Sequence, residues 1–210
     1  MRRLTACVLM MTLLLSACKA GTMAAETPEK AALALREEYQ ALAGWSATVD
    51  VSVCYSDTVY DFTLDAQWRR EGETVLTVTA PELLAGITAR VAQGETVLEY
   101  DGAGLSLGLL DGAGLTPVSA VTALMEQIEK GYMARCAWAG EEEQYLQISF
   151  QDPELEANAG TQFLLTFDRN SRALLSAEVS VAGETVLRAE IRNFTTEMKQ
   201  DDTGNSANLG

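Results

Sequence analysis

The chain has 210 residues, of which 15 are basic and 30 acidic, and it contains no histidine. The net charge of −15 disfavours binding to the anionic phosphate backbone of nucleic acids, and no basic patch with interleaved aromatic residues offsets it. The absence of histidine excludes Ser-His-Asp and Cys-His catalysis and removes the commonest zinc ligand. We therefore expect a protein that is not an enzyme and that holds no metal or cofactor.

The first 17 residues form a predicted secretory signal. Arg2 and Arg3 precede a short apolar run, Val8–Leu15, that ends in small residues. This run is too short to cross a bilayer core, which needs about 20 apolar residues. Residues Leu15–Cys18, directly at its end, resemble the lipobox of bacterial lipoproteins. The resemblance implies cleavage before Cys18 and a diacylglyceryl group on its sulfur; the alternative is an ordinary signal with an incidental cysteine.

Lipid on Cys18 would hold the protein to a membrane without electrostatic attraction to the membrane surface. Each buried CH₂ contributes roughly 0.8 kcal/mol, so two or three acyl chains hold firmly. Cleavage removes two arginines and no acids, which takes the net charge from −15 to −17. An anionic membrane surface repels such a chain. We expect it on the outer face of the bacterial cytoplasmic membrane, or on a periplasm-facing membrane in a host with two, with residues 18–26 as a flexible tether.

Two amphipathic helices are predicted. Thr27, Pro28 and an acid in the first turn begin the first helix, which we expect to end at Gly44. Thr116 and a following proline begin the second, which Gly131 ends. The apolar face of the first helix holds Leu35, Tyr39 and Leu42, and that of the second holds Val118, Val121, Met125 and Ile128.

From Trp45 the hydrophobic period changes to two. Residues 45–55 and 60–69 alternate apolar with polar side chains, which predicts two long neighbouring strands with one dry and one wet face. Gly-Glu-Thr-Val-Leu occurs three times, from Gly72, Gly94 and Gly183, where we expect glycine to supply the positive φ of a hairpin turn. Nine further strands are predicted at residues 74–80, 86–92, 96–100, 105–109, 135–139, 144–150, 162–167, 173–181 and 185–193.

Eleven mostly antiparallel strands are too many for a flat layer, because adjacent strands twist until the sheet curls. We predict an α+β, mostly β domain over residues 27–198: an incomplete antiparallel β-barrel of about eleven strands, with the helices covering its concave face. The polar tail, residues 199–210, is predicted to be disordered. The dry face of the two long strands is then both core and candidate ligand-binding pocket, with Val49, Val51, Phe62, Leu64 and Trp68 lining it.

Three passages resemble the LolA/LolB family of lipoprotein carriers. They are the helix that leads into Ala43–Ala47, the strand, proline loop and hairpin of Trp68–Tyr100, and the closing hairpin of Leu174–Phe194. The resemblance implies an unclosed barrel with a helical lid that carries acyl chains in its concavity. The family's carrier latches its lid with the arginine of an Arg-Pro pair at the end of strand two. Arg69 or Arg70 matches that arginine, and glutamate replaces the proline.

Two functions remain open. The first is binding of an acyl chain or another apolar ligand, including the acyl chain of a lipoprotein, in the half-barrel. The second is an interaction module with a filled core that anchors or activates an exported protein, since some lipoproteins of this fold bind cell-wall enzymes. A large cavity would favour the first function, and a filled core with an exposed apolar rim would favour the second.

Two smaller motifs carry separate predictions. Cys54 and Cys136 remain once the signal is removed and Cys18 is lipidated, so they are a candidate disulfide in an extracytoplasmic compartment. Residues Gly104–Gly108 fit the Gly-x-Ser-x-Gly pattern of a nucleophile elbow. That elbow needs a strand-to-helix turn and a histidine base, so we interpret the segment as strand and turn.

The anchoring prediction is tested by replacing Cys18 with serine. Without the sulfur no thioether to lipid forms, so we expect Cys18→Ser to leave the protein soluble or retained as precursor, as cell fractionation with a high-salt wash would show. Cys7→Ser is the matched control, because that cysteine leaves with the signal and its loss should not change the membrane fraction. A Cys18→Ser protein that stays in the washed membranes would contradict the prediction.

Overall fold

The computed structural model describes residues 26–55, 58–109, 116–156 and 159–199. The predictions for the signal, Cys18, the tether up to residue 25 and the tail from residue 200 lie outside the described residues. None of the described helices has the length and apolar character that a membrane span requires.

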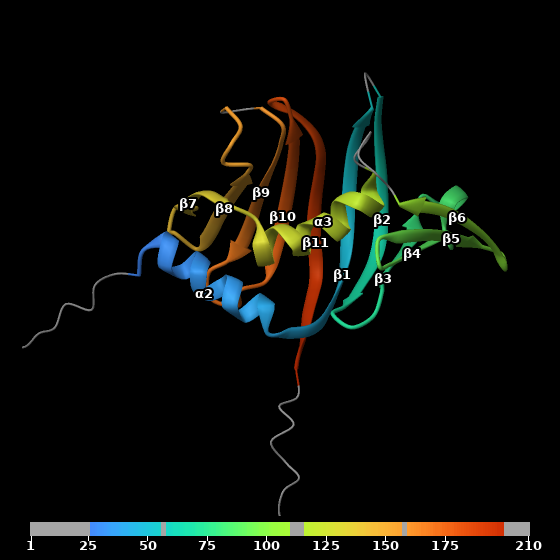
Figure 1. Cartoon of the computed structure of the whole chain (residues 1–210), viewed down its shortest axis with the longest axis horizontal. Coiled ribbons are helices and arrows are strands. Elements are labelled where there is room, and N and C mark those ends of the chain that lie inside the picture. Colours follow the sequence, from blue (N-terminus) through green and yellow to red (C-terminus); the bar gives the residue numbers. More distant parts are fainter. Residues whose placement is uncertain (1–25, 56–57, 110–115, 157–158, 200–210) are drawn as a thin grey trace, which may run out of the picture.

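Within the described chain, eleven antiparallel strands form one unclosed sheet with two α-helices on one face, which confirms the predicted architecture (Figure 1). The order in the sheet is β6-β5-β4-β3-β2-β1-β11-β10-β9-β8-β7. Sheet neighbours are therefore chain neighbours except where β1 pairs with β11. The strands are β1 (Leu42–Tyr55), β2 (Thr58–Arg69), β3 (Thr74–Ala80), β4 (Thr88–Ala92), β5 (Glu95–Tyr100), β6 (Ala103–Leu109), β7 (Met133–Ala139), β8 (Tyr145–Gln151), β9 (Thr161–Asp168), β10 (Leu174–Val181) and β11 (Glu184–Met198), with a short 3-10 helix η2 (Glu82–Leu84) after β3.

The helices are α2 (Pro28–Gln40) and α3 (Pro117–Lys130), and both begin at the predicted caps. The Thr27 hydroxyl accepts a hydrogen bond from the backbone N–H of Lys30 at 3.4 Å, and Thr116 and Ser119 form a reciprocal capping box. The predicted end of the first helix is wrong. Leu42 already pairs with β11 at the start of β1, so Gly44 lies in a strand.

The core lies between the sheet and the helices. Figure 1 shows α3 crossing in front of β11 and β1, while α2 packs against β7, β8 and α3. A row of side chains in register crosses seven strands on this face, and all its members but the two end residues are buried. From β7 to β2 the row is Cys136, Ile148, Leu165, Ala177, Ala189, Val51 and Phe62.

Two of the three predicted turn glycines have positive φ. Gly94 (φ 85°) and Gly183 (φ 83°) close two-residue hairpins after residues that also have positive φ, as type I′ turns require. The prediction is wrong for Gly72, which lacks a positive φ. The connection there is longer, because Trp68 pairs with Thr74 and leaves five residues between them.

The predicted disulfide is also wrong. Cys54 lies on the outer face of β1, next to the buried Val53, whereas Cys136 lies on the helix-covered face of β7. Four strands separate β1 from β7. Neighbouring strands lie about 4.8 Å apart, so the two thiols are far beyond the Cα separation of roughly 4.4–6.8 Å that a disulfide needs.

Truncating the centre of the buried row should unfold the sheet far more readily than truncating an exposed helix residue. Leu165 has no exposed surface, so Leu165→Ala should lower the free energy of unfolding by about 2–5 kcal/mol. Leu33→Ala on α2, where the leucine is 56% exposed, should change it by less than about 0.5 kcal/mol. Urea denaturation measures both, and similar losses would contradict the assigned core.

Candidate functional site

All five predicted ligand-lining residues face the helices. Val49 pairs with Leu64 and Val51 with Phe62 across β1 and β2, and Trp68 lies on the same face of β2. Val49, Val51 and Leu64 are buried, whereas Phe62 and Trp68 are partly buried against the same core. The structure therefore brings the five together on the predicted face. Their role in binding a ligand stays a prediction.

Side chains of the two helices fill the space over these strands. The buried residues of α3 are Ala120, Val121, Leu124, Met125 and Ile128, and those of α2 are Ala31, Ala32, Leu35 and Tyr39. Two described hollows lie at the margins of this layer. One, of about 380 Å³, lies where β3 ends, and the eight residues that line it include Pro81 and two of the predicted ligand-lining residues, Val51 and Phe62. The other, of about 420 Å³, lies at the β5–β6 hairpin.

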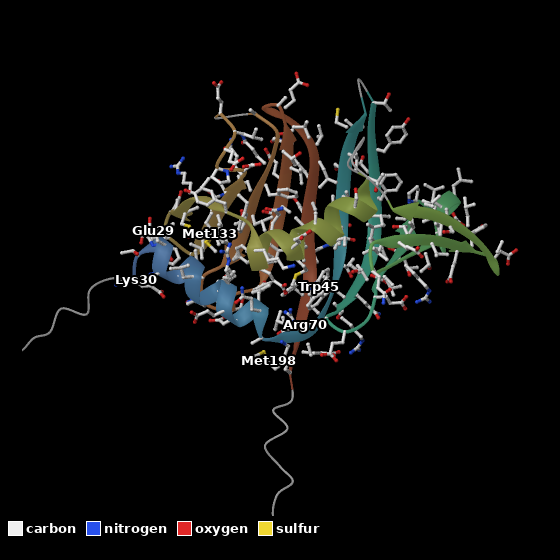
Figure 2. All side chains as sticks on the ribbon, in the orientation of Figure 1. Glu29, Lys30, Trp45, Arg70, Met133 and Met198 are labelled. Carbon is white, nitrogen blue, oxygen red and sulfur yellow. The ribbon has the colours of Figure 1, made fainter. Side chains whose placement is uncertain are left out.

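Arg70, and not Arg69, joins the helices to the sheet. Its Nε donates to the Leu42 carbonyl at 2.7 Å, and its terminal nitrogen donates to the Tyr39 carbonyl at 3.0 Å and to the Glu129 carboxylate at 2.7 Å. One guanidinium thus holds the end of α2, the start of β1 and the last turn of α3. Arg69 forms an ion pair with Glu197 on the surface. Figure 2 shows Arg70 and Trp45 at the same end of the sheet.

Two α2 side chains, which the sequence analysis did not single out, reach the end of α3. Arg36 donates to the carbonyls of Ile128 (2.9 Å) and Gly131 (2.5 Å), and Gln40 donates to the Glu129 carbonyl at 2.9 Å. The last carbonyls of a helix have no partner within it, so these bonds satisfy groups that burial would otherwise penalise. Burial lowers the pKa of Arg36 from its ordinary value.

Burial also dominates the two other titratable groups of this layer. It raises the pKa of the Tyr39 hydroxyl, which donates to the Arg172 carbonyl at 2.9 Å. It raises the pKa of the Cys136 thiol, with a further contribution from the Glu29 carboxylate and an opposing one from Arg36.

The cover of the concave face thins across β3–β6, which we call the wing (Thr74–Leu109). In Figure 1 the wing projects to one side of the molecule. The register sets one concave row across it, and the exposure of that row rises toward the edge. Its members from β1 outward are Ala47, Ala66, Leu76 and Ala89, all buried, then Leu98, partly buried, and Leu105, 61% exposed.

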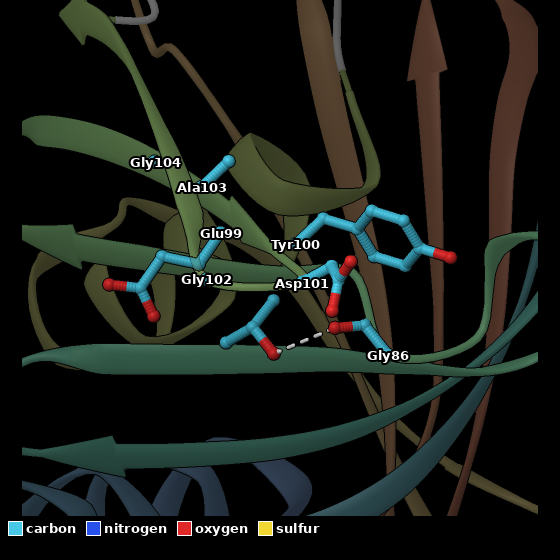
Figure 3. A pocket seen from close by; sticks show the side chains of 8 residues that line it. Gly86, Glu99, Tyr100, Asp101, Gly102, Ala103 and Gly104 are labelled. Atoms are coloured by element: carbon cyan, nitrogen blue, oxygen red, sulfur yellow. Dashed lines mark hydrogen bonds between the residues drawn. The ribbon is translucent and has the colours of Figure 1, made fainter.

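The edge of the wing therefore presents an apolar strip to solvent. Tyr100 on β5 is 55% exposed and Leu107 on β6 is 41% exposed, beside Leu105. Figure 3 shows the adjacent hollow, with the Tyr100 ring and the Glu99 carboxylate directed away from each other. The small residues Ala103 and Gly104 also line this hollow.

Charge on the wing is mostly negative. It contains four acids and one base, Arg90. Arg90 is already paired, at 2.5 Å with Glu73 and at 3.0 Å with Glu99, and these pairs raise its pKa. The candidate functional site is thus an apolar strip with an acidic surround.

The elbow-like motif, Gly104–Gly108, lies on the wing. Ser106 of the elbow-like motif lies in the middle of β6, not at a strand-to-helix turn. Within the described ranges, no group of three or more Cys, Asp or Glu side chains is placed to hold a metal ion. What the site offers is an apolar surface and an open strand edge.

No family model and no curated protein matches the chain. It is similar to a solved structure of an uncharacterised conserved protein from Thermus thermophilus, at 9% identity and a TM-score of 0.48, over 82% of this chain and 89% of that one. It is also similar to a LolA superfamily protein from Nitrosomonas europaea, at 11% identity and a TM-score of 0.41, over 85% and 96%. A structure of the CwlD amidase from Clostridioides difficile in complex with the GerS lipoprotein matches at 12% identity and a TM-score of 0.43, over 81% and 96%. At identities this low, the function of the chain has to rest on its own residues.

The different contacts of the two adjacent arginines predict different effects of their removal. Arg70→Ala should cost about 1.5–3 kcal/mol of stability, because it leaves Glu129 and two backbone carbonyls without their donor. Arg69→Ala should cost no more than about 1 kcal/mol, since its ion pair is exposed. Thermal unfolding of the two variants gives the comparison. Equal effects would contradict the assignment of Arg70 as the residue that joins helices and sheet.

Proposed function

We propose that this protein is a non-catalytic lipoprotein, anchored through Cys18 to the outer face of the bacterial cytoplasmic membrane or to a periplasm-facing membrane, that binds an exported protein through its wing. The observation that supports the proposal most is the contrast along the sheet. Helices fill the concave face over β1 and β11, whereas the apolar strip of Tyr100, Leu105 and Leu107 is exposed. Exposed apolar patches of this kind favour a role in molecular contacts.

The position of the anchor supports a partner in solution over the membrane itself. The tether from Cys18 to Glu26 spans eight residue steps, so it reaches at most about 30 Å. It enters α2 at one end of the molecule's long axis, and the wing lies at the other end (Figure 1). The anchored end and the wing are therefore at opposite ends of the molecule.

Binding of an acyl chain is the second candidate function. It is favoured by the continuity of the exposed strip with the buried core, since Leu105 and the partly buried Leu98 pair in the same row. An acyl chain could extend from this strip toward Phe62 if α3 moved away. The predicted ligand-lining residues, Val49 and Val51 among them, would then become accessible.

One substitution in the covered half separates the two functions. In a filled core, Leu64→Trp overpacks and should cost about 1–3 kcal/mol, while the volume-conserving Leu64→Met should cost less than about 1.5 kcal/mol. We expect this result, together with no saturable binding of a fluorescent fatty acid by the wild type. A Leu64→Trp protein that keeps its stability but loses fatty-acid binding would instead establish the acyl-chain function.

A further inference from the structure

We propose that β6 is a docking edge, to which an extended segment of an exported protein adds as a further strand. The segment would alternate apolar with basic side chains. This inference rests on the proposed function and deepens it, because it names the surface and the chemistry of the partner. In the described chain β6 is one of the two ends of the sheet and pairs with β5 alone.

The hairpin before β6 determines which backbone groups face the open edge. Asp101 (φ 48°) and Gly102 (φ 76°) form a two-residue type I′ turn, so Tyr100 and Ala103 are its hydrogen-bonded pair. Hydrogen-bonded and non-hydrogen-bonded pairs then alternate as far as the pair of Val97 and Ser106, after which the register shifts. The N–H and C=O groups of Gly104 and Ser106 therefore point away from β5, toward the edge.

Proteins usually protect an edge strand with charged side chains, proline, a β-bulge or a covering segment. The pairing of β6 with β5 is regular from Ala103 to Ser106, and its one register shift lies beyond, between Ser106 and Gly108. Residues Ala103–Leu109 include no charge and no proline, and Ala103–Leu107 are all exposed. The opposite edge, β7, contains Arg135 and is covered by α2, and its Trp138 indole donates to the Glu26 carbonyl at 3.3 Å.

The two faces of β6 define what the added strand would carry. On the concave face, exposed Leu105 offers an apolar contact to a neighbouring strand, and exposed Leu107 follows at the register shift. On the outer face, Gly104 and Ser106 are small. Glu99 lies directly across from Gly104, so a lysine or arginine on the added strand would share this carboxylate with Arg90.

The negative charge of the wing favours a basic protein segment at the β6 edge over a second copy of the chain or a membrane. A second copy would bring another acidic wing against the first, since each wing has four acids and one base that is already paired. A membrane is disfavoured by the same negative charge and by the distance from the anchor. A basic, extended protein segment gains main-chain hydrogen bonds from the edge and ion pairs from its surround.

Fluorescence anisotropy with two labelled peptides tests the proposal. One alternates valine with lysine and the other valine with glutamate. The protein is the full chain carrying Cys18→Ser, which removes the lipid as a competing site. We expect the lysine peptide to bind at least about tenfold more tightly than the glutamate peptide, because its side chains complement the acidic wing.

Ser106 provides a matched pair of edge variants. Ser106→Pro removes an edge-facing N–H without removing a bond to β5, and we expect it to weaken binding of the lysine peptide at least about tenfold. Ser106→Ala keeps that N–H and should bind within about twofold of the parent. Circular dichroism confirms that both variants are folded.

Three results would overturn the proposal. The first is binding of the lysine peptide to Ser106→Pro as tightly as to the parent, and the second is equal binding of the two peptides. The third is a dimer in sedimentation that Ser106→Pro dissociates, because that would assign the edge to a second copy. None of these results would affect the Cys18 or Leu64 tests of the proposed function.

Discussion

The structure depends on one constraint: an unclosed sheet with one apolar face must keep that face from water. Antiparallel sheets solve this by packing one side on a core and leaving the other in solvent. Here the buried row from Ile148 to Val51 runs under two helices, and the outer face carries polar and charged side chains such as Arg192, whose guanidinium pairs with Asp50. The helices cover only part of the sheet, and the apolar strip at the edge of the wing stays exposed.

The helices are held over the sheet by arginines that satisfy backbone carbonyls. Arg36 binds the end of α3, and Arg70 binds the end of α2 together with Glu129. The bonds of Arg36 join α2 to the end of α3. The bonds of Arg70 join the end of α2 to the start of β1. The covered half of the sheet is therefore tied together by polar groups at its rim as well as by its core. The wing has no such tie to either helix among the hydrogen bonds of the described residues.

Local patterns in the sequence predicted most of the fold. Period-two alternation gave the eleven strands, and caps at Thr27 and Thr116 gave both helix starts, because these signals depend on neighbouring residues alone. The wrong predictions concern features that depend on pairing between strands far apart in the sequence. Pairing of Leu42 with β11 ended the first helix early, and the strand order put Cys54 and Cys136 far apart.

The site was less predictable than the fold. The sequence placed Val49 and Leu64 on the correct face, but it does not show whether helix side chains or a ligand occupy the space above them. The sequence left Arg69 and Arg70 as candidates for the arginine that joins the helices to the sheet. The tertiary contacts identify Arg70 as that residue. The open edge of β6 follows from the strand order and hairpin register, which no local pattern contains.

Backbone hydrogen exchange tests most directly whether the sheet is covered over β1 and open at β6. The amides of Val49 and Leu165, which lie on strands paired on both sides, should exchange only on global unfolding. The Leu105 amide, bonded to β5, should be protected, whereas those of Gly104 and Ser106 should exchange close to the rate of an unstructured chain. Protection of Gly104 and Ser106 equal to that of Leu105 would contradict an open edge, and fast exchange at Val49 would contradict a filled concave face.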